Sequence, residues 1–264
     1  NVSGAGDIDR RFTLEGGKVD FGGSLAVGDE LRVDSGSLST KGGITSDNLL
    51  INGGTVTASG DLGLAGNADI KGGKLDVTGS AYMGGNLITK GGNTTIGNRL
   101  DVLGQAVLNS GSLSASGAMT ADTMLVKGAT VSVGNGLITN GLDVSAGKLN
   151  VTGAAQVGPL NMNGGEVSVE GMLSADDATI TAGKLNTSGS MIANSLTMNG
   201  GEVNIGQLTK DGITTSGELT VKNFEMSSGS LNIYNSKMTA GKAPIGTSSA
   251  DKLDYGFTTT GGDI

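Results

Sequence analysis

Residues that could support catalysis are few in this chain, because its 264 residues include no His and no Cys. Triads built on His, thiolate nucleophiles and the usual zinc sites are therefore excluded. Carboxylates remain, and the candidates for acid–base chemistry are Asp29–Glu30, Asp176–Asp177, Asp61, Asp69 and Asp101. Adjacent acids on a strand point to opposite faces, which favours a turn over a catalytic dyad at Asp176–Asp177. No position of the repeat described below collects acids over three units, so we expect no enzymatic activity.

Calcium is the metal to consider, because many solenoid proteins bind it. Repeat-in-toxin solenoids hold calcium in turns with the pattern Gly-Gly-x-Gly-x-Asp. In this chain the double glycines are followed by Lys, Thr, Glu or Asn and then by an apolar residue. The calcium pattern is absent, so calcium is without support and we expect no cofactor.

One short pattern returns along most of the chain: a small residue, Gly, any residue, Leu or Val, a polar residue and an apolar residue, as in GGKLDV at Gly72–Val77. The second position of the pattern recurs at a nearly constant interval. It is occupied by Gly17, Gly36, Gly54, Gly73, Gly92, Gly111, Ala129, Gly147, Gly165, Gly183 and Gly201. Gly229 follows only after a much longer interval, which predicts a disturbed register over Leu208–Glu225.

Each repeat contains three short segments in which apolar and polar residues alternate. This period of two is typical of half-buried strands. Gly, or occasionally Asn, stands six positions after each Gly of the repeat and indicates a corner with positive φ. Such strands cannot bury their apolar side alone, but coils stacked on one another bury a continuous core. The predicted fold is all-β: a single β-solenoid, or parallel β-helix, with about 12–13 triangular coils of about 18–19 residues each.

Charged residues follow one position of the repeat and alternate in sign. Lys148, Glu166, Lys184 and Glu202 are each separated by one repeat. On successive coils they would lie side by side as a stacking ladder. Opposite charges on neighbouring strands stabilise by about 0.2–1 kcal/mol per pair, and like charges oppose a register slip. The alternative is that these are four solvated side chains whose alternation has no structural role.

Aromatic residues gather toward the two ends of the chain, where a solenoid leaves an unpaired sheet edge. Only Tyr82 of the seven aromatic residues is central. We predict an N-terminal cap or assembly segment over residues 1–13, the β-solenoid over 14–242 and a C-terminal cap or assembly tail over 243–264. The candidate assembly residues are Phe12, Phe21, Phe224, Tyr234, Tyr255 and Phe257.

Composition narrows the partners and the location of the protein. The formal net charge of −8 argues against nucleic acid, whose backbone requires a basic surface. No apolar run approaches the roughly 18 residues of a membrane-spanning helix, so we expect no membrane insertion. The absence of Cys fits a secreted bacterial protein, and the start at Asn1 is interpreted as a processed terminus.

Runs such as NGGTVTASGDLGLAGNADIKGGKLDVTGSA resemble the passenger regions of bacterial autotransporters and of adhesins of the filamentous-haemagglutinin type. The resemblance covers about Leu14–Ile233 and implies a secreted β-solenoid on the bacterial surface with a role in adhesion, aggregation or biofilm. The short coil is also similar to that of bactofilins, which polymerise end to end. No functional residue of these families maps onto a position of this chain.

Two functions follow as expectations. The first is a structural subunit of an extracellular bacterial fibre or biofilm matrix, a homopolymer that assembles end to end through its terminal coils. The second is a monomeric adhesin passenger domain that binds glycans or a host surface along one face of the solenoid.

Overall fold

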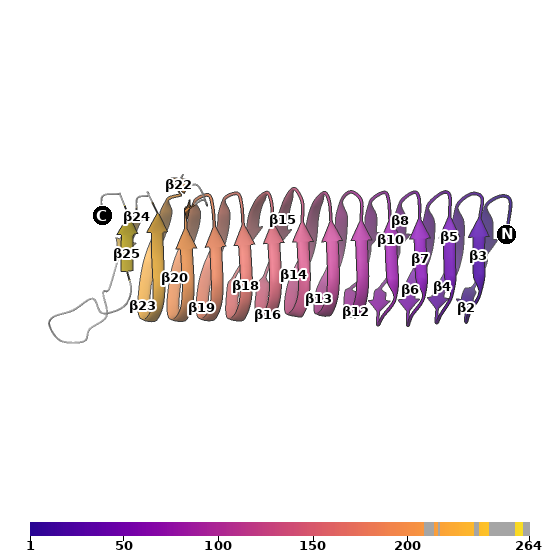
Figure 1. The fold of residues 1–264 in the computed structure, drawn as a ribbon, viewed down its shortest axis with the longest axis horizontal. Helices are drawn as coiled ribbons and strands as arrows, with labels where there is room; N and C mark the ends of the chain where they lie inside the picture. Colours follow the sequence, from indigo (N-terminus) through magenta and orange to yellow (C-terminus); the bar gives the residue numbers. More distant parts are fainter. Residues whose placement is uncertain (209–213, 216, 235–237, 243–256, 261–264) are drawn as a thin grey trace. The chain divides into compact units, whose positions relative to one another are not determined.

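The structure is a computed structural model that describes residues 1–208, 214–215, 217–234, 238–242 and 257–260. These residues form strands, corners and turns, with no helix among them. The fold is all-β, a parallel β-solenoid of about 12 turns whose coils are about 18 residues apart, as predicted. The chain divides into two units, Asn1–Asn135 and Gly136–Ile264, and the strands of each unit follow one another as successive coils (Figure 1).

The first unit contains fourteen strands, several of which continue around a corner. They are β1 (Gly6–Ile8), β2 (Arg11–Leu14), β3 (Lys18–Phe21), β4 (Leu25–Val33), β5 (Ser37–Thr40), β6 (Ile44–Ile51), β7 (Thr55–Ala58), β8 (Leu62–Leu64), β9 (Ala68–Ile70), β10 (Lys74–Val77), β11 (Ala81–Met83), β12 (Leu87–Ile96), β13 (Leu100–Ala115) and β14 (Ala118–Val133). The segment 1–13 thus includes β1 and most of β2, and both strands pair with β4 in parallel register.

The second unit continues with the same kind of strand. The described strands are β15 (Gly136–Thr139), β16 (Leu142–Val151), β17 (Ala154–Val157), β18 (Leu160–Val169), β19 (Leu173–Thr187), β20 (Met191–Ile205), β21 (Gln207–Leu208), β22 (Thr214–Thr215), β23 (Leu219–Tyr234), β24 (Met238–Lys242) and β25 (Phe257–Thr260). Of the predicted tail 243–264, only β25 is described.

Each coil has three strand segments, which we call faces 1, 2 and 3. In one coil of the first unit, face 1 is β7, face 2 is β8 and face 3 is β9. Each segment pairs in parallel with the same face of the next coil: Thr55 pairs with Lys74, and Leu62 pairs with Ala81. Both partners stand one full coil further along the chain. Residues at one position of the repeat therefore form a straight column.

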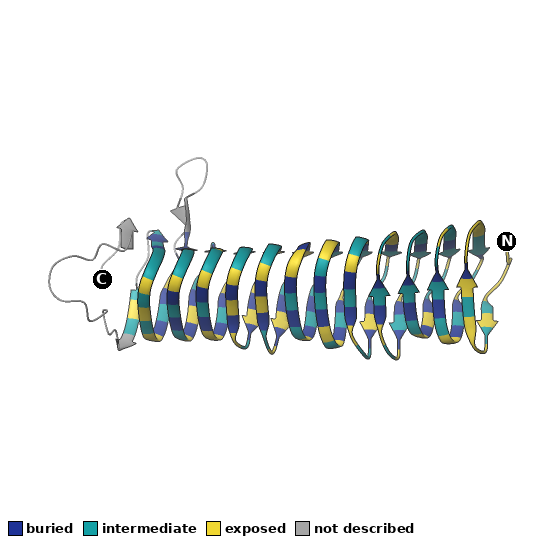
Figure 2. Ribbon diagram, turned by 90° about the horizontal axis from the view of Figure 1, so that it is seen from below, coloured by how far each residue is buried: buried dark blue, intermediate teal, exposed yellow. Residues whose placement is uncertain are grey.

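The core consists of the apolar positions that the alternation predicted. On face 1 of the first unit, Leu38, Val56 and Leu75 are all 0% exposed. In the second unit, Leu185 and Val203 are also 0% exposed. Burying one such side chain contributes about 1.5–3 kcal/mol, and the columns repeat this gain at every coil. Buried and exposed residues alternate along the strands in Figure 2.

The disturbed register is an insertion at one corner of the second unit. Leu185 pairs with Val203 after a coil of regular length, whereas Val203 pairs with Leu231 after a distinctly longer one. The additional residues include β21 and β22, which pair with each other in antiparallel fashion. Regular pairing resumes at Leu219, so the disturbance predicted over Leu208–Glu225 ends earlier than expected. An insertion at a corner leaves the inward and outward positions of the flanking strands unchanged.

Candidate assembly edge and stacking ladders

The first coil ends in strands that have a partner on one side only. Among the described residues, β1 and β2 pair with β4 and with no other strand. The Leu14 carbonyl accepts a hydrogen bond from Asp34 N at 2.8 Å. Because alternate residues of a parallel strand face the same neighbour, Arg11 and Thr13 direct their backbone groups to the opposite, outer edge. No described strand pairs with this outer edge.

The edge of β3 is partly closed by the residues that begin the chain. Val2 forms an isolated parallel bridge with Phe21. Val2 N donates to the Asp20 carbonyl at 2.7 Å, and Gly22 N donates to the Val2 carbonyl at 2.8 Å. Val2 therefore pairs only with the last part of β3, and this residue remains 42% exposed.

Two of the predicted assembly residues meet at the start of the core. The rings of Phe12 and Phe21 pack edge to face with 6.4 Å between their centroids. Phe21 is buried and Phe12 is half-buried. A Cβ added to Gly6 would lie 2.3 Å from the Phe21 ring, so the glycine leaves the space that this ring fills. The aromatic pair thus packs at the start of the core, and Phe12 stays partly exposed.

Of the remaining predicted assembly residues, Phe224, Tyr234 and Phe257 lie on the last described strands of the second unit. Phe224 and Tyr234 are half-buried on β23, where Phe224 pairs with Leu196. The backbone of Phe257 in β25 pairs with Leu231. Tyr255 lies outside the described residues.

The four residues of the predicted charge ladder stand beside one another on face 1 of the second unit. Lys148 pairs in register with Glu166, Glu166 with Lys184 and Lys184 with Glu202. Ion pairs join Lys148 Nζ to Glu166 Oε2 at 2.9 Å and Lys184 Nζ to Glu202 Oε1 at 3.1 Å. All four side chains are at least one-third exposed, so each pair contributes about 0–1 kcal/mol.

An amide ladder beside this charge ladder was not recognised in the sequence. Asn186 Nδ2 donates to Ser168 Oγ at 3.3 Å, Asn204 Nδ2 to Asn186 Oδ1 at 2.8 Å and Asn232 Nδ2 to Asn204 Oδ1 at 2.8 Å. Asn204 also donates to Glu202 Oε1 at 2.7 Å. This hydrogen bond, and then the Lys184 ammonium, lower the pKa of Glu202 below its ordinary value. The recurrence of Asn at one repeat position was the signal.

A second unrecognised ladder lies at the corner between faces 2 and 3 of the first unit. Asn48 Oδ1 accepts a hydrogen bond from Asn67 N at 2.9 Å. Asn67 Oδ1 accepts from Asn86 N, and Asn86 Oδ1 from Gln105 N, both at 2.8 Å. Each side chain therefore satisfies a backbone N–H of the next coil. The dipeptides Gly66–Asn67 and Gly85–Asn86 were the sequence signal.

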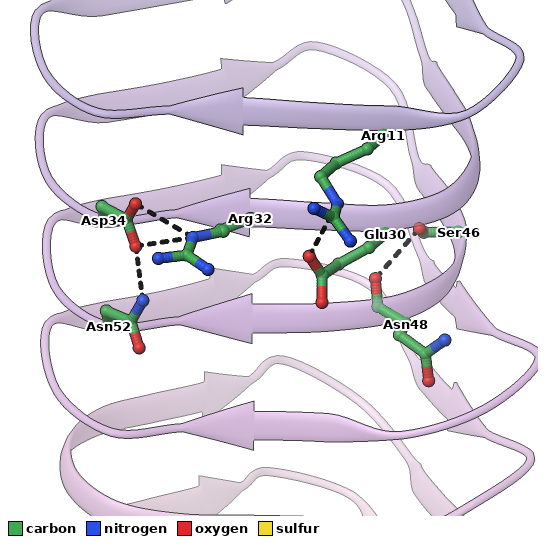
Figure 3. A network of polar contacts seen from close by, with 7 residues as sticks. All are labelled: Arg11, Glu30, Arg32, Asp34, Ser46, Asn48 and Asn52. Carbon is green, nitrogen blue, oxygen red and sulfur yellow. Dashed lines mark hydrogen bonds and ion pairs between the residues drawn. The ribbon is translucent and has the colours of Figure 1, made fainter.

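Charged side chains also link the first coils (Figure 3). Arg11 Nε lies 3.1 Å from Glu30 Oε1 on the next coil. Arg32 Nε donates to both Asp34 oxygens at 2.9 Å, and Asn52 Nδ2 donates to the same carboxylate. These bonds, that of Arg32 first, lower the pKa of Asp34. Of the acids that could have been catalytic, Glu30 belongs to this group of contacts.

The other acidic candidates are spread along the structure. Asp69 lies 3.5 Å from Lys90, Asp101 accepts from Arg99, and Asp177 accepts from Ser195 Oγ. Within the described ranges, no three acidic residues come close enough to hold a metal ion. The same ranges contain no helix of the length and apolarity that a membrane span requires.

Comparison with protein-family models, curated proteins and solved structures gave no significant match to this chain. The parallel β-solenoid is consistent with the fold of β-helix surface proteins. The autotransporter and haemagglutinin identity remains a prediction.

Proposed function

We propose that this protein is a structural subunit of an extracellular bacterial fibre or biofilm matrix, and that it assembles end to end through its terminal coils. The observation that carries the proposal is the outer edge of β1 and β2, which has no partner among the described residues. A new coil pairs with such an edge through backbone hydrogen bonds, as in β-strand addition. The secreted location rests on the absence of Cys and on the resemblance of the repeats.

The side chains of this edge suit a junction. Phe12 is half-buried beside Phe21 and would become fully covered by a further coil. An aromatic side chain in such a position contributes a large apolar area. Head-to-tail stacking of identical chains is a heterologous contact that does not close, so it produces filaments.

Negative-stain electron microscopy of the purified protein over a concentration series tests this function. We expect unbranched filaments whose length increases with concentration. Thr13→Pro should shorten or abolish them, because Thr13 directs its N–H to the outer edge and proline removes that donor without breaking a bond to β4. Thr13→Ala is the matched control, since it keeps the N–H and should form filaments of normal length.

Circular dichroism must show that Thr13→Pro remains folded. Isolated particles of the unaltered protein at every concentration would contradict the proposal. Normal filaments from Thr13→Pro together with normal filaments from a chain lacking residues 1–13 would place the junction elsewhere.

A further inference from the structure

Tyr82 is an exposed aromatic side chain in the interior of the first unit. Its neighbours in β11, Ala81 and Met83, are buried at 1% and 0% exposure, and Tyr82 is 46% exposed between them. Its hydroxyl makes no hydrogen bond with any described residue. An exposed ring that is neither packed in the core nor hydrogen-bonded offers its apolar face to a ligand.

The position beside Tyr82 on the preceding coil has no side chain. Tyr82 pairs in register with Gly63 of β8. A Cβ built on Gly63 would contact only Thr45 Cγ2, at 3.6 Å. The glycine is therefore not required by close packing or by a positive φ. It leaves open backbone next to the ring.

A fixed polar group lies on the other side. Tyr82 pairs with Asp101 of β13, whose carboxylate accepts from Arg99 Nε at 2.7 Å and from Thr120 Oγ1 at 2.5 Å. The Arg99 side chain is 57% exposed. Its terminal nitrogens donate to no described residue, so N–H donors stand ready beside a held carboxylate.

A second exposed apolar side chain adjoins this group. Leu103 is 59% exposed and follows Asp101 by two positions, at the corner where the register shifts between Val102 and Gln105. In the described part of the first unit, Val2, Tyr82 and Leu103 are the exposed large apolar residues, and Val2 belongs to the terminal edge. Tyr82, Leu103, Gly63, Arg99 and Asp101 stand on three successive coils, and we call them the Tyr82 shelf.

We propose that the Tyr82 shelf binds a neutral polysaccharide through a sugar ring placed against Tyr82. A pyranose ring has an apolar C–H face, which suits the aromatic ring and Leu103. Its hydroxyl groups both donate and accept, which suits the Asp101 carboxylate and the Arg99 N–H groups. The net charge of −8 disfavours an anionic polymer. A protein partner would remove the Arg99–Asp101 pair from water at a cost in desolvation free energy. Sugar hydroxyl groups would instead replace the water and keep the pair hydrogen-bonded. The proposal does not depend on end-to-end assembly.

Retention on microcrystalline cellulose and on chitin beads tests the shelf. We expect the unaltered protein to be retained by at least one of them and Tyr82→Ala to be retained about tenfold less, the loss expected of one aromatic contact. Tyr82→Phe should be retained like the unaltered protein. Ile138→Ala, which removes a 54% exposed apolar side chain from the second unit, is the matched control.

Gly63→Val provides a test that leaves the ring in place. The added side chain fills the open backbone beside Tyr82, and a β-branched residue suits a strand, so the fold should be kept while retention falls. Tyr82→Trp introduces one indole into a chain that has no Trp, and its fluorescence should shift when a soluble oligosaccharide of the retained polymer is added. Failure of both polysaccharides to retain the protein, or equal losses for Ile138→Ala and Tyr82→Ala, would overturn the proposal. So would a change in self-association caused by Tyr82→Ala, which would identify the patch as a contact between copies.

Discussion

The amide ladders join neighbouring coils at a corner in the first unit and on a face in the second. In the first unit, Asn48, Asn67 and Asn86 accept hydrogen bonds from backbone N–H groups of the following coil. In the second unit, Asn186 and Asn204 bond to side chains of neighbouring coils. A bond to the backbone fixes the path of the chain at a corner, whereas a bond between side chains mainly favours one register.

The difference accompanies coil length. In the longer coils of the first unit, the inward residues Leu62 of face 2 and Ala68 of face 3 have five others between them. In the shorter coils of the second unit, the corresponding residues Leu173 of face 2 and Ala178 of face 3 have four others between them. The additional residue of the longer coils lies at the corner between faces 2 and 3, where it makes room for Gly66–Asn67. The backbone N–H groups that donate to the asparagine side chains therefore all belong to coils with the extra residue.

The positive φ predicted six positions after the repeat glycine is wrong for Gly60 and Gly79, because it occurs at the repeat glycine itself, at the corner before face 1. This corner is common to both units and should give the largest effects. Gly73 and Gly165 have φ values of 73° and 70°, so alanine at either costs about 1–2 kcal/mol. A Cβ on Gly73 would also lie 2.3 Å from the Gly54 carbonyl oxygen, whereas that on Gly165 has its nearest atoms at 2.9 Å. Overpacking adds about 1–3 kcal/mol at Gly73.

We therefore expect urea unfolding to show a greater loss of stability for Gly73→Ala than for Gly165→Ala. Gly63→Ala is the control, because its Cβ has room and its φ is not positive; its stability should be unchanged or slightly higher. Equal losses at Gly73 and Gly165 would mean that backbone conformation alone sets the cost.

The ladders should respond differently to the loss of an amide. Asn67→Ala leaves the backbone N–H of Asn86 without its acceptor, which costs about 1–2 kcal/mol. Asn186→Ala removes only bonds between side chains and should cost about 0.5–1 kcal/mol. Hydrogen exchange at the Asn86 amide should accelerate about tenfold in Asn67→Ala and remain unchanged in Asn186→Ala. Gln156→Ala, at an exposed position on face 2, serves as the control.

The core of this fold could be predicted from single positions of the sequence. Leu38, Val56 and Leu75 recur at one repeat position and alternate with polar residues. Glycines follow them at a constant distance. The repeat, the alternation and the glycines therefore all predict a buried strand position. The column of Lys148, Glu166, Lys184 and Glu202 was visible for the same reason, because every coil there has the same length.

The corner ladder could not be read in this way. Asn48 stands in a shorter coil than Asn67, so the two do not share one distance from the repeated glycine. Their partners are backbone N–H groups, which leave no trace in residue types. The Tyr82 shelf could not be predicted from the sequence for a similar reason. Its open space comes from the missing side chain of Gly63, and only the register of three coils brings its residues together.

Reversing one charge should have a smaller effect, confined to the second unit. Lys184→Glu places an acid between Glu166 and Glu202 in adjacent register, which should lower stability by about 0.5–1 kcal/mol at low salt. The loss should shrink as salt is added, because these side chains are exposed. Reversing all four charges of the ladder preserves the alternation and should restore stability. A loss that persists in the fourfold variant would assign the effect to residue size.

The smallest effect expected is a change in the acid dependence of stability. The pKa of Glu202 is lowered by the Asn204 amide and then by the Lys184 ammonium, so the folded protein binds this proton less readily than the unfolded chain. The carboxylate therefore stabilises the fold above its unfolded pKa of about 4.3, and this contribution is lost as the pH falls through the lower folded value. Glu202→Gln should have a lower melting temperature than the unaltered protein at pH 6, and the two curves should converge toward pH 3. Glu225→Gln, at an exposed position of β23, should run parallel to the unaltered protein. If Glu202→Gln also ran parallel to the unaltered protein, the amide ladder would hold the coils without help from the neighbouring charge.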